Sequence, residues 1–142
     1  MNRLSNTTYD QLSVGNSAEL IEIINQKVVL NFIKLFGDNN PLHCDTDYAA
    51  STEFGQPVVH GAILTSFCSK LVGVYLPGKY ALYLSNEFKF HDPVFINDKI
   101  KIRGLISRKV DAFKIIEITI EIKNLTANKI AATGKALVRL LK

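Results

Sequence analysis

The sequence has no tryptophan, one methionine and only two cysteines among its 142 residues. The cysteines, Cys44 and Cys68, have no spacing typical of a metal site, and so few thiols suit a reduced cytoplasmic interior. The three histidines also lack the close spacing of metal ligands. We therefore expect no bound metal.

Long apolar runs and dense basic blocks are absent too. No run is long enough to span a membrane, and residues 1–6 lack the apolar core of a secretory signal, so we predict a cytoplasmic protein with no membrane partner. The 17 Lys and Arg residues are scattered and balanced by 13 Asp and Glu, giving a net charge of +4. This mild charge fits a small anionic ligand, and we expect no nucleic-acid partner.

The composition is that of an ordinary globular chain, with 47% hydrophobic and 21% charged residues. We find no repeat, low-complexity tract or linker. The sequence therefore predicts a single domain over residues 1–142, with an irregular segment over residues 1–16.

Residues 38–43, Asp-Asn-Asn-Pro-Leu-His, place a carboxylate and an imidazole five residues apart. An apolar stripe predicts a helix over residues 26–36, and Gly37 fits the left-handed residue that ends such a helix. Because a proline disfavours helix in the residue before it, we expect a non-helical overhang that points Asp38 and His43 at one spot. Such a pair can act as acid and base, although the same pattern also fits a simple turn.

Apolar spacing predicts the other elements. A strand is expected over residues 17–24, and Asn25 can cap the helix that follows. A long helix is expected from Gly61 to about Val74, and we expect it to be buried on nearly all sides because Lys70 is its only charged residue. Small residues form one face of this helix, along which another backbone can approach: Ala62, Ser66, Ser69 and Gly73.

The remaining sequence is typical of β-structure. Strands are expected over residues 83–90, 99–103, 116–123 and 130–140, with short turns between them. One-faced strands joined by short turns imply an antiparallel sheet with one face covered, and only the long helix is apolar enough to cover it. The predicted fold class is α+β, a curved antiparallel sheet wrapped around one long central helix, which is the hotdog arrangement. On the first of these strands the large side chains expected to share one side are Leu84, Phe88 and Phe90.

These segments resemble the MaoC-like (R)-specific enoyl-CoA hydratases of the hotdog superfamily. The resemblance covers about residues 15–140 and depends on two blocks in order, residues 37–43 and residues 57–61 (Pro-Val-Val-His-Gly). It implies reversible syn addition of water to a trans-2-enoyl-CoA, giving (R)-3-hydroxyacyl-CoA. It also implies that no metal or organic cofactor is needed, and that the enzyme is a homodimer or a dimer of dimers.

The resemblance assigns roles residue by residue. Asp38 and His43 match the catalytic pair, and Asn40 matches the residue that steadies the overhang. Gly61 matches the position whose backbone N–H binds the thioester carbonyl, and Ser69 matches a polar position near the pair. His60 precedes Gly61 and is expected either to cap the long helix or to line the site.

Three alternatives remain open. A (3R)-hydroxyacyl-[acyl carrier protein] dehydratase would use the same residues on a carrier-bound chain. A non-catalytic hotdog subunit that binds acyl thioesters would need none of them, and a hotdog thioesterase shares the fold. The chain departs from the family's usual residues at positions that bear on the acyl pocket: Phe36, His91 and Asn97.

Overall fold

The computed structural model of the chain describes residues 4–142. Our expectation about an N-terminal signal falls partly on residues 1–3, which lie outside the described residues. The segment that follows is more ordered than predicted, because Tyr9–Gln11 form a short 3-10 helix whose Tyr9 is buried. No helix in the described part of the chain is long and apolar enough to cross a membrane.

One antiparallel sheet forms the body of the molecule. Its strands are β1 (Ser17–Ile23), β2 (Ala81–Phe90), β3 (Lys99–Val110), β4 (Ile115–Asn124) and β5 (Lys129–Leu140). They pair in the order β1-β3-β4-β5-β2, so β1 and β2 are the two edges. The strands predicted from apolar alternation are therefore confirmed, although β3 extends well past its predicted end.

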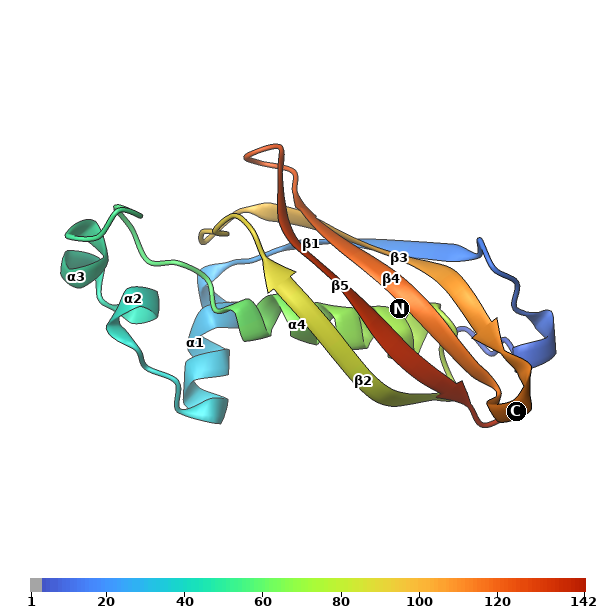
Figure 1. The fold of residues 1–142 in the computed structure, drawn as a ribbon. Coiled ribbons are helices and arrows are strands. Elements are labelled where there is room, and N and C mark those ends of the chain that lie inside the picture. Colours follow the sequence, from blue (N-terminus) through green and yellow to red (C-terminus); the bar gives the residue numbers. More distant parts are fainter. Residues whose placement is uncertain (1–3) are drawn as a thin grey trace.

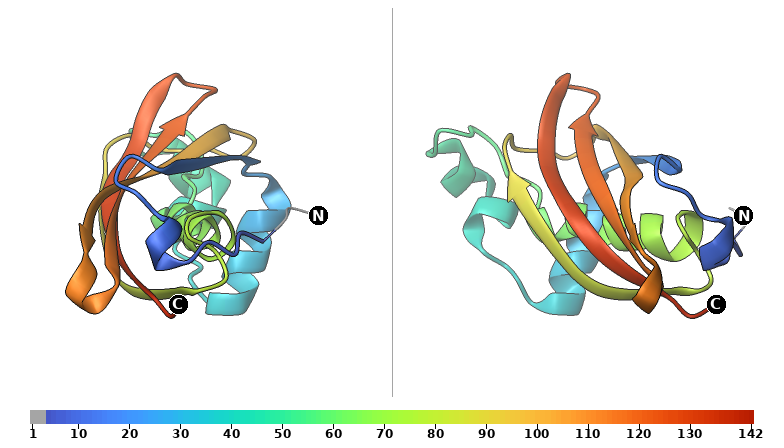
Figure 2. Two further views of the ribbon diagram at one scale, coloured as in Figure 1. Left: turned by 90° about the vertical axis from the view of Figure 1, so that its right-hand side faces the viewer. Right: turned by 45° about the vertical axis from the view of Figure 1, so that its right-hand side comes forward.

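A central helix lies against the concave face of this sheet. The helices are α1 (Gln26–Phe36), α2 (Pro41–Cys44), α3 (Thr46–Ala50) and α4 (Gly61–Lys70), and α4 continues as a π-turn, η2 (Leu71–Tyr75). The predicted long helix is confirmed as α4 and η2 together. Figure 1 shows α1, α2 and α3 gathered near the N-terminal end of α4, and Figure 2 shows the sheet curling around α4.

The covered face of the sheet is the apolar one. The four isoleucines at alternate positions 116–122 of β4 are at most 3% exposed. Gly104 of β3 allows the central helix to approach closely, because a Cβ at this position would lie 2.6 Å from Cδ2 of Leu71. The expected α+β architecture, a curved sheet around one helix, is thus confirmed.

Two details of the packing correct the sequence predictions. The central helix is not buried on nearly all sides, because the sheet covers one side only. Its small-residue face is exposed in the single chain, and it consists of Ala62, Ser66, Ser69 and Gly73.

The second correction concerns β2. A register shift between Tyr83 and Ser85 interrupts the alternation of side chains along this strand. As a result Leu84 lies on the exposed face, opposite the core-packed Phe88. Phe90 keeps the predicted side with Phe88, since its ring lies over Gly61 of α4, although it is 54% exposed at the end of the strand. A bulge of this kind moves the residues on one side of it to the opposite face of the strand.

Candidate active site

A tight turn at the end of α1 delivers the chain to Asp38. Asn25 caps the start of α1 as predicted, since its side chain accepts a hydrogen bond from the Val28 N–H at 3.1 Å. Gly37 ends the helix in the left-handed region, with φ of 77°, which glycine adopts without strain. The sequence thus predicted correctly how the chain reaches Asp38.

The stretch that follows is only partly the non-helical overhang we expected, because it is non-helical over residues 37–40 alone. Residues 41–44 form α2, with Pro41 at its first turn and Asn40 as its N-cap. The Asn40 side chain accepts from the Leu42 N–H at 3.0 Å, and the Asp38 carboxylate accepts from the Asn40 N–H at 3.3 Å. The prediction failed after residue 40 because proline, which breaks the helix before it, is also well suited to begin the next one.

His43 extends from α2 toward the residues that precede α4. Its Nδ1 lies 2.6 Å from the Val58 carbonyl oxygen, which can only accept a hydrogen bond. Nδ1 therefore carries a proton, and in the neutral form of the ring Nε2 has a free lone pair. This is the protonation state that a general base needs.

His60 lies directly behind this pair. Its side chain is only 2% exposed, its ring stacks on that of His43 at 3.8 Å between centroids, and Phe32 of α1 packs on it at 4.8 Å. Its Nε2 lies 3.0 Å from the backbone oxygen of Asp38. Although His60 is the N-cap residue of α4, its side chain forms no capping hydrogen bond, so the expected capping role is wrong.

The structure brings Asp38, His43 and His60 together, with one nitrogen or oxygen atom of each within 4.8 Å of the others. Zn²⁺ with ligands at 2.0–2.2 Å needs them closer to one another, at about 3.5 Å in a tetrahedral site. The two imidazole planes are also inclined by only 27°, so their in-plane lone pairs do not converge on one ion. In this arrangement the three residues fit proton transfer better than metal binding.

Gly61, at the first turn of α4, presents a free backbone N–H. No acceptor within residues 4–142 takes a hydrogen bond from it. A Cβ at Gly61 would lie 2.8 Å from Cζ of Phe90, so only glycine fits beneath this ring without movement. A helix N-terminus with an unpaired N–H attracts a developing negative charge through its hydrogen bond and the helix dipole.

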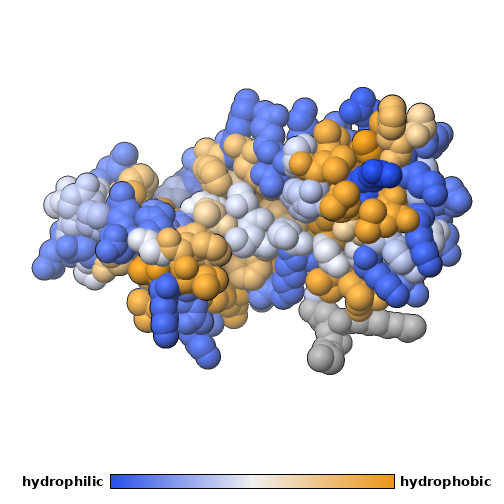
Figure 3. All heavy atoms as spheres, turned by 90° about the horizontal axis from the view of Figure 1, so that it is seen from below, coloured by the Kyte–Doolittle hydropathy of each residue, from blue (hydrophilic) through white to orange (hydrophobic). Residues whose placement is uncertain are grey.

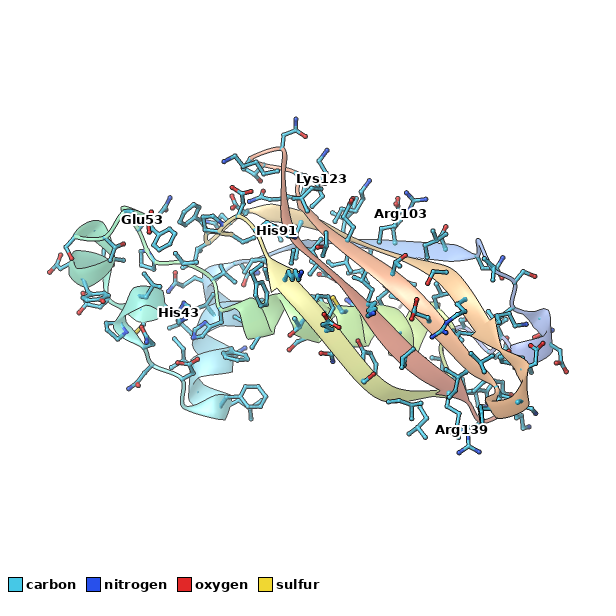
Figure 4. The ribbon with its side chains drawn as sticks, in the orientation of Figure 1. His43, Glu53, His91, Arg103, Lys123 and Arg139 are labelled. Atoms are coloured by element: carbon cyan, nitrogen blue, oxygen red, sulfur yellow. The ribbon has the colours of Figure 1, made fainter. Side chains whose placement is uncertain are left out.

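A pocket of about 370 Å³ joins His43 to Gly61. Its walls are largely apolar and include Val59, Leu64 and Phe90. Figure 4 shows His43 near the N-terminal end of α4, with His91 just beyond the end of β2 and Arg103 and Arg139 far along the sheet. The size and apolar walls suit a short acyl chain.

The predicted site residues therefore separate into two groups. Asp38, Asn40, His43 and Gly61 gather at the N-terminal end of α4, as described above. Ser69 does not join them in the single chain, because it lies eight residues further along α4, about 12 Å by helix rise, and it does not line the pocket. Its assignment stays a prediction.

Other contributors were missed by sequence reasoning. The carbonyl of Val58 fixes the His43 tautomer, and the ring of Phe90 covers Gly61. Any residue type can supply a backbone carbonyl, so the contact of Val58 with a side chain 15 residues away could not be predicted from the sequence. Phe90 had only its place at the end of a predicted strand.

Comparison with known proteins places this geometry in a family. The model of the MaoC like domain matches residues 13–128. The chain belongs to this family. The (R)-specific enoyl-CoA hydratase of Aeromonas caviae is 36% identical over 129 residues, which cover 91% of this chain and 96% of that protein.

Two further similarities extend the comparison. The solved structure of an unliganded R-hydratase from Pseudomonas aeruginosa superposes with a TM-score of 0.87 at 28% identity, covering 94% of this chain and 84% of that one. The predicted hotdog fold is therefore confirmed. A mitochondrial 3-hydroxyacyl-[acyl-carrier-protein] dehydratase of Arabidopsis thaliana is 29% identical over 89 residues, 63% of this chain and 52% of that protein. The family resemblance and the hydro-lyase class predicted from sequence are borne out by these relatives.

Proposed function

We propose that this MaoC-like protein catalyses the reversible hydration of trans-2-enoyl-CoA to (R)-3-hydroxyacyl-CoA. The observation that carries the proposal is that His43 lies beside Asp38 and lines one apolar pocket together with Gly61, whose N–H is free. Hydration of a conjugated thioester needs a water activated by a base, a proton donor and a site for the negative charge on the carbonyl oxygen. These three functions are available here.

The acid–base chemistry falls to Asp38 and His43. A water held between the Asp38 carboxylate and Nε2 of His43 is positioned to lose a proton as its oxygen attacks C3 of the substrate. The same proton, or its equivalent on the pair, then returns to C2. Because one pair serves both transfers from one side, water adds to a single face of the double bond.

Gly61 is positioned to stabilise the negative charge that develops on the substrate during this addition. As the water oxygen bonds to C3, electrons move through C2 to the thioester carbonyl and form an enolate. The Gly61 N–H can donate to this oxygen, and the absence of a Cβ lets the thioester approach. The dipole of α4 favours the same negative charge. The thioester itself activates the double bond, so the proposal requires no metal or organic cofactor.

The test is to follow the enoyl-thioester absorbance band with purified protein and crotonyl-CoA, and then to separate the product enantiomers. We expect the band to disappear as (R)-3-hydroxybutyryl-CoA forms. The (S) product, or no reaction across C4 to C12 enoyl-CoA substrates, would reject the proposal.

The runner-up is dehydration of a (3R)-hydroxyacyl chain carried by acyl carrier protein, which the similarity to the Arabidopsis dehydratase favours. The same side chains would perform it. Turnover of enoyl-carrier substrates with no turnover of the matching CoA thioesters would select this alternative. Failure with both classes would point to a non-catalytic subunit that binds acyl thioesters.

We also propose that the protein forms a homodimer or a dimer of dimers. The exposed small-residue face of α4 and the unpaired edge of β2 are surfaces on which a second copy can pack. Figure 3 shows apolar side chains exposed on the face seen from below. Leu35 and Phe36 at the end of α1 are among the most exposed large hydrophobic side chains of the described residues. In such a dimer the predicted substrate site lies near the subunit boundary, where Ser69 of α4 is exposed.

The cytoplasm stays our prediction for the location. Both cysteines are free and Cys44 is exposed. An exposed free thiol is compatible with a reducing compartment.

A further inference from the structure

Three successive residues before α4 connect both halves of the acid–base pair to Gly61. The Val58 N–H donates to the Leu42 carbonyl of α2 at 3.0 Å, and the Val58 carbonyl accepts from Nδ1 of His43 at 2.6 Å. His60 then bonds to the backbone of Asp38. The segment is itself fixed on its other side, since the Val59 N–H donates to the Val94 carbonyl at 2.8 Å.

His60 is the only side chain in this segment that reaches Asp38. Its Nε2 lies 3.0 Å from the Asp38 carbonyl oxygen and 3.9 Å from the nearer carboxylate oxygen. A carbonyl oxygen can only accept, so Nε2 carries the proton and donates it. This hydrogen bond spans 22 residues and ties the turn after α1 to the start of α4.

The other ring nitrogen of His60 makes no hydrogen bond within the described part of the chain. Nδ1 is buried and has no hydrogen-bond partner among the described residues. A donor at Nδ1 would be buried without an acceptor, which is unfavourable. The ring is therefore fixed in one tautomer, with its donor aimed at Asp38.

The flat face of the same ring supports His43. The two rings stack at 3.8 Å with planes inclined by 27°, and Phe32 closes the opposite side of His60 at 4.8 Å. With Nδ1 held by Val58 and one face held by His60, the ring of His43 has its Nε2 direction fixed.

We propose that His60 is a positioning residue for the hydration reaction, holding Asp38 and His43 at a fixed distance from the Gly61 N–H. This inference rests on the proposed function. It predicts that the Nε2–H donor of His60, rather than the bulk of its ring alone, is required for turnover. The reason is that the reacting water needs the carboxylate and the imidazole in register, and a misplacement of about 1 Å can cost on the order of 10²-fold in rate.

The experiment compares two variants of the full chain. His60→Gln keeps a side-chain N–H donor at a similar reach, whereas His60→Phe keeps a ring that can stack on His43 but has no donor. We expect kcat with crotonyl-CoA to fall about 10²-fold in His60→Phe, with KM changed little because the pocket walls are intact. His60→Gln should recover most of this loss. Imidazole ¹⁵N shifts of the wild type should show the neutral Nε2–H tautomer for His60 at pH 7.

Two controls keep the result interpretable. Ile118→Val, in the buried centre of β4, tests whether a modest loss of stability alone changes kcat. We expect kcat of this variant to equal that of the wild type at 25 °C. If His60→Phe does not fold, His60→Leu replaces it in the comparison with His60→Gln.

Near wild-type kcat in the donor-free variant would overturn the inference, and so would a folded His60→Gln that is as slow as His60→Phe. A wild-type protein without hydratase activity would instead reject the proposed function, and this role for His60 with it. The two failures are distinguishable because only the second affects the wild type.

Discussion

Asp38 and His60 lie in contact but in opposite environments. The Asp38 side chain is 53% exposed, whereas that of His60 beneath it is 2% exposed. The reacting groups thus sit on a buried aromatic platform without themselves being part of the core. Side-chain changes at Asp38 should for this reason alter chemistry with little effect on the fold.

Gly61 is a position where adding a single methyl group should reduce activity. A Cβ there would lie 2.8 Å from the ring of Phe90, which is 54% exposed and free to turn aside. We expect Gly61→Ala to remain folded but to lose about 10–10²-fold in kcat/KM, because either the methyl group or the displaced ring obstructs the thioester carbonyl.

The double variant Gly61→Ala/Phe90→Ala serves as the control for this prediction. If the displaced ring is the obstacle, removing it should recover part of the loss. Wild-type kcat/KM in Gly61→Ala would contradict the role of this N–H.

The two thiols should differ sharply in reactivity. Cys44 is exposed, whereas Cys68 on α4 is fully buried, and burial raises the pKa of the Cys68 thiol to about 12. Because the thiolate is the reactive form, we expect one thiol to react quickly with a disulfide reagent at pH 8 and the second only after unfolding. Two fast thiols in the native protein, or a Cys44→Ser variant that still shows one, would contradict the packing of α4.

Among the elements, α1 and its ends could be predicted from local chemistry. The cap at Asn25 and the left-handed Gly37 depend on a few neighbouring residues, and the structure has both. The helix α2 could not be predicted in the same way. Pro41 favours both the end of a helix before it and the start of a helix after it, and the structure has both, whereas only the first was predicted.

The cap of α2 gives a prediction for this element. Asn40→Ala removes the acceptor for the Leu42 N–H, which should cost about 1 kcal/mol of stability. We expect a larger effect on turnover than on stability, since α2 carries His43 and its first turn follows Asp38. Urea unfolding and kcat with crotonyl-CoA measure the two effects on the same preparation. Asn40→Ser, which can still cap, should lie closer to the wild type, and equal kcat in all three proteins would show that the cap does not position His43.

The central helix shows a different limit of sequence reasoning. Its composition is that of a helix buried all round, yet Ala62, Ser66, Ser69 and Gly73 are exposed in the single chain. The apolar pattern of the helix shows which of its faces are suited to burial, whether the same chain or a second copy buries them. The pattern does not indicate which of the two covers a given face.

For the molecule as a whole, the sequence predicted the strands but not how they meet. Alternation of side chains is a local property and located all five strands. The order β1-β3-β4-β5-β2 brings β2 beside β5, far apart in the chain, and follows from how the strands close over the helix. The clustering of His60 with Asp38 likewise joins residues 22 positions apart, which explains why the role of His60 stayed ambiguous at the level of sequence.

Alkaline pH should weaken the fold. Burial, followed by the hydrogen bond to Asp111 at 2.7 Å, raises the pKa of Tyr9 to about 12, and burial raises the pKa of Tyr83 to about 12. Unfolded tyrosine loses its proton near pH 10, so at lower pH the two tyrosines stay protonated in both states and do not change the stability. The buried Cys68 thiol, whose pKa is also raised, adds a loss of stability that begins near pH 9. Between pH 10 and pH 12 the unfolded chain releases protons that the folded protein retains, so the free energy of unfolding should fall as the pH rises.

The matched variant for this prediction is Tyr9→Phe, with urea unfolding followed at pH 8, 10 and 11. Loss of the hydrogen bond to Asp111 should lower stability by about 1 kcal/mol at pH 8. The decline above pH 10 should be shallower than in the wild type, because one of the two tyrosines no longer titrates. An unchanged or steeper decline would show that Tyr9 does not contribute to it.

The decisive measurement for the proposed chemistry is kcat for crotonyl-CoA hydration in the wild type, Asp38→Asn and His43→Ala, with melting curves for each. General acid–base catalysis contributes about 10²–10⁴-fold per group, so each variant should lose at least that order of kcat while melting within a few degrees of the wild type. A folded Asp38→Asn or His43→Ala protein that hydrates crotonyl-CoA at nearly the wild-type rate would contradict the assignment of this pair as the acid and base.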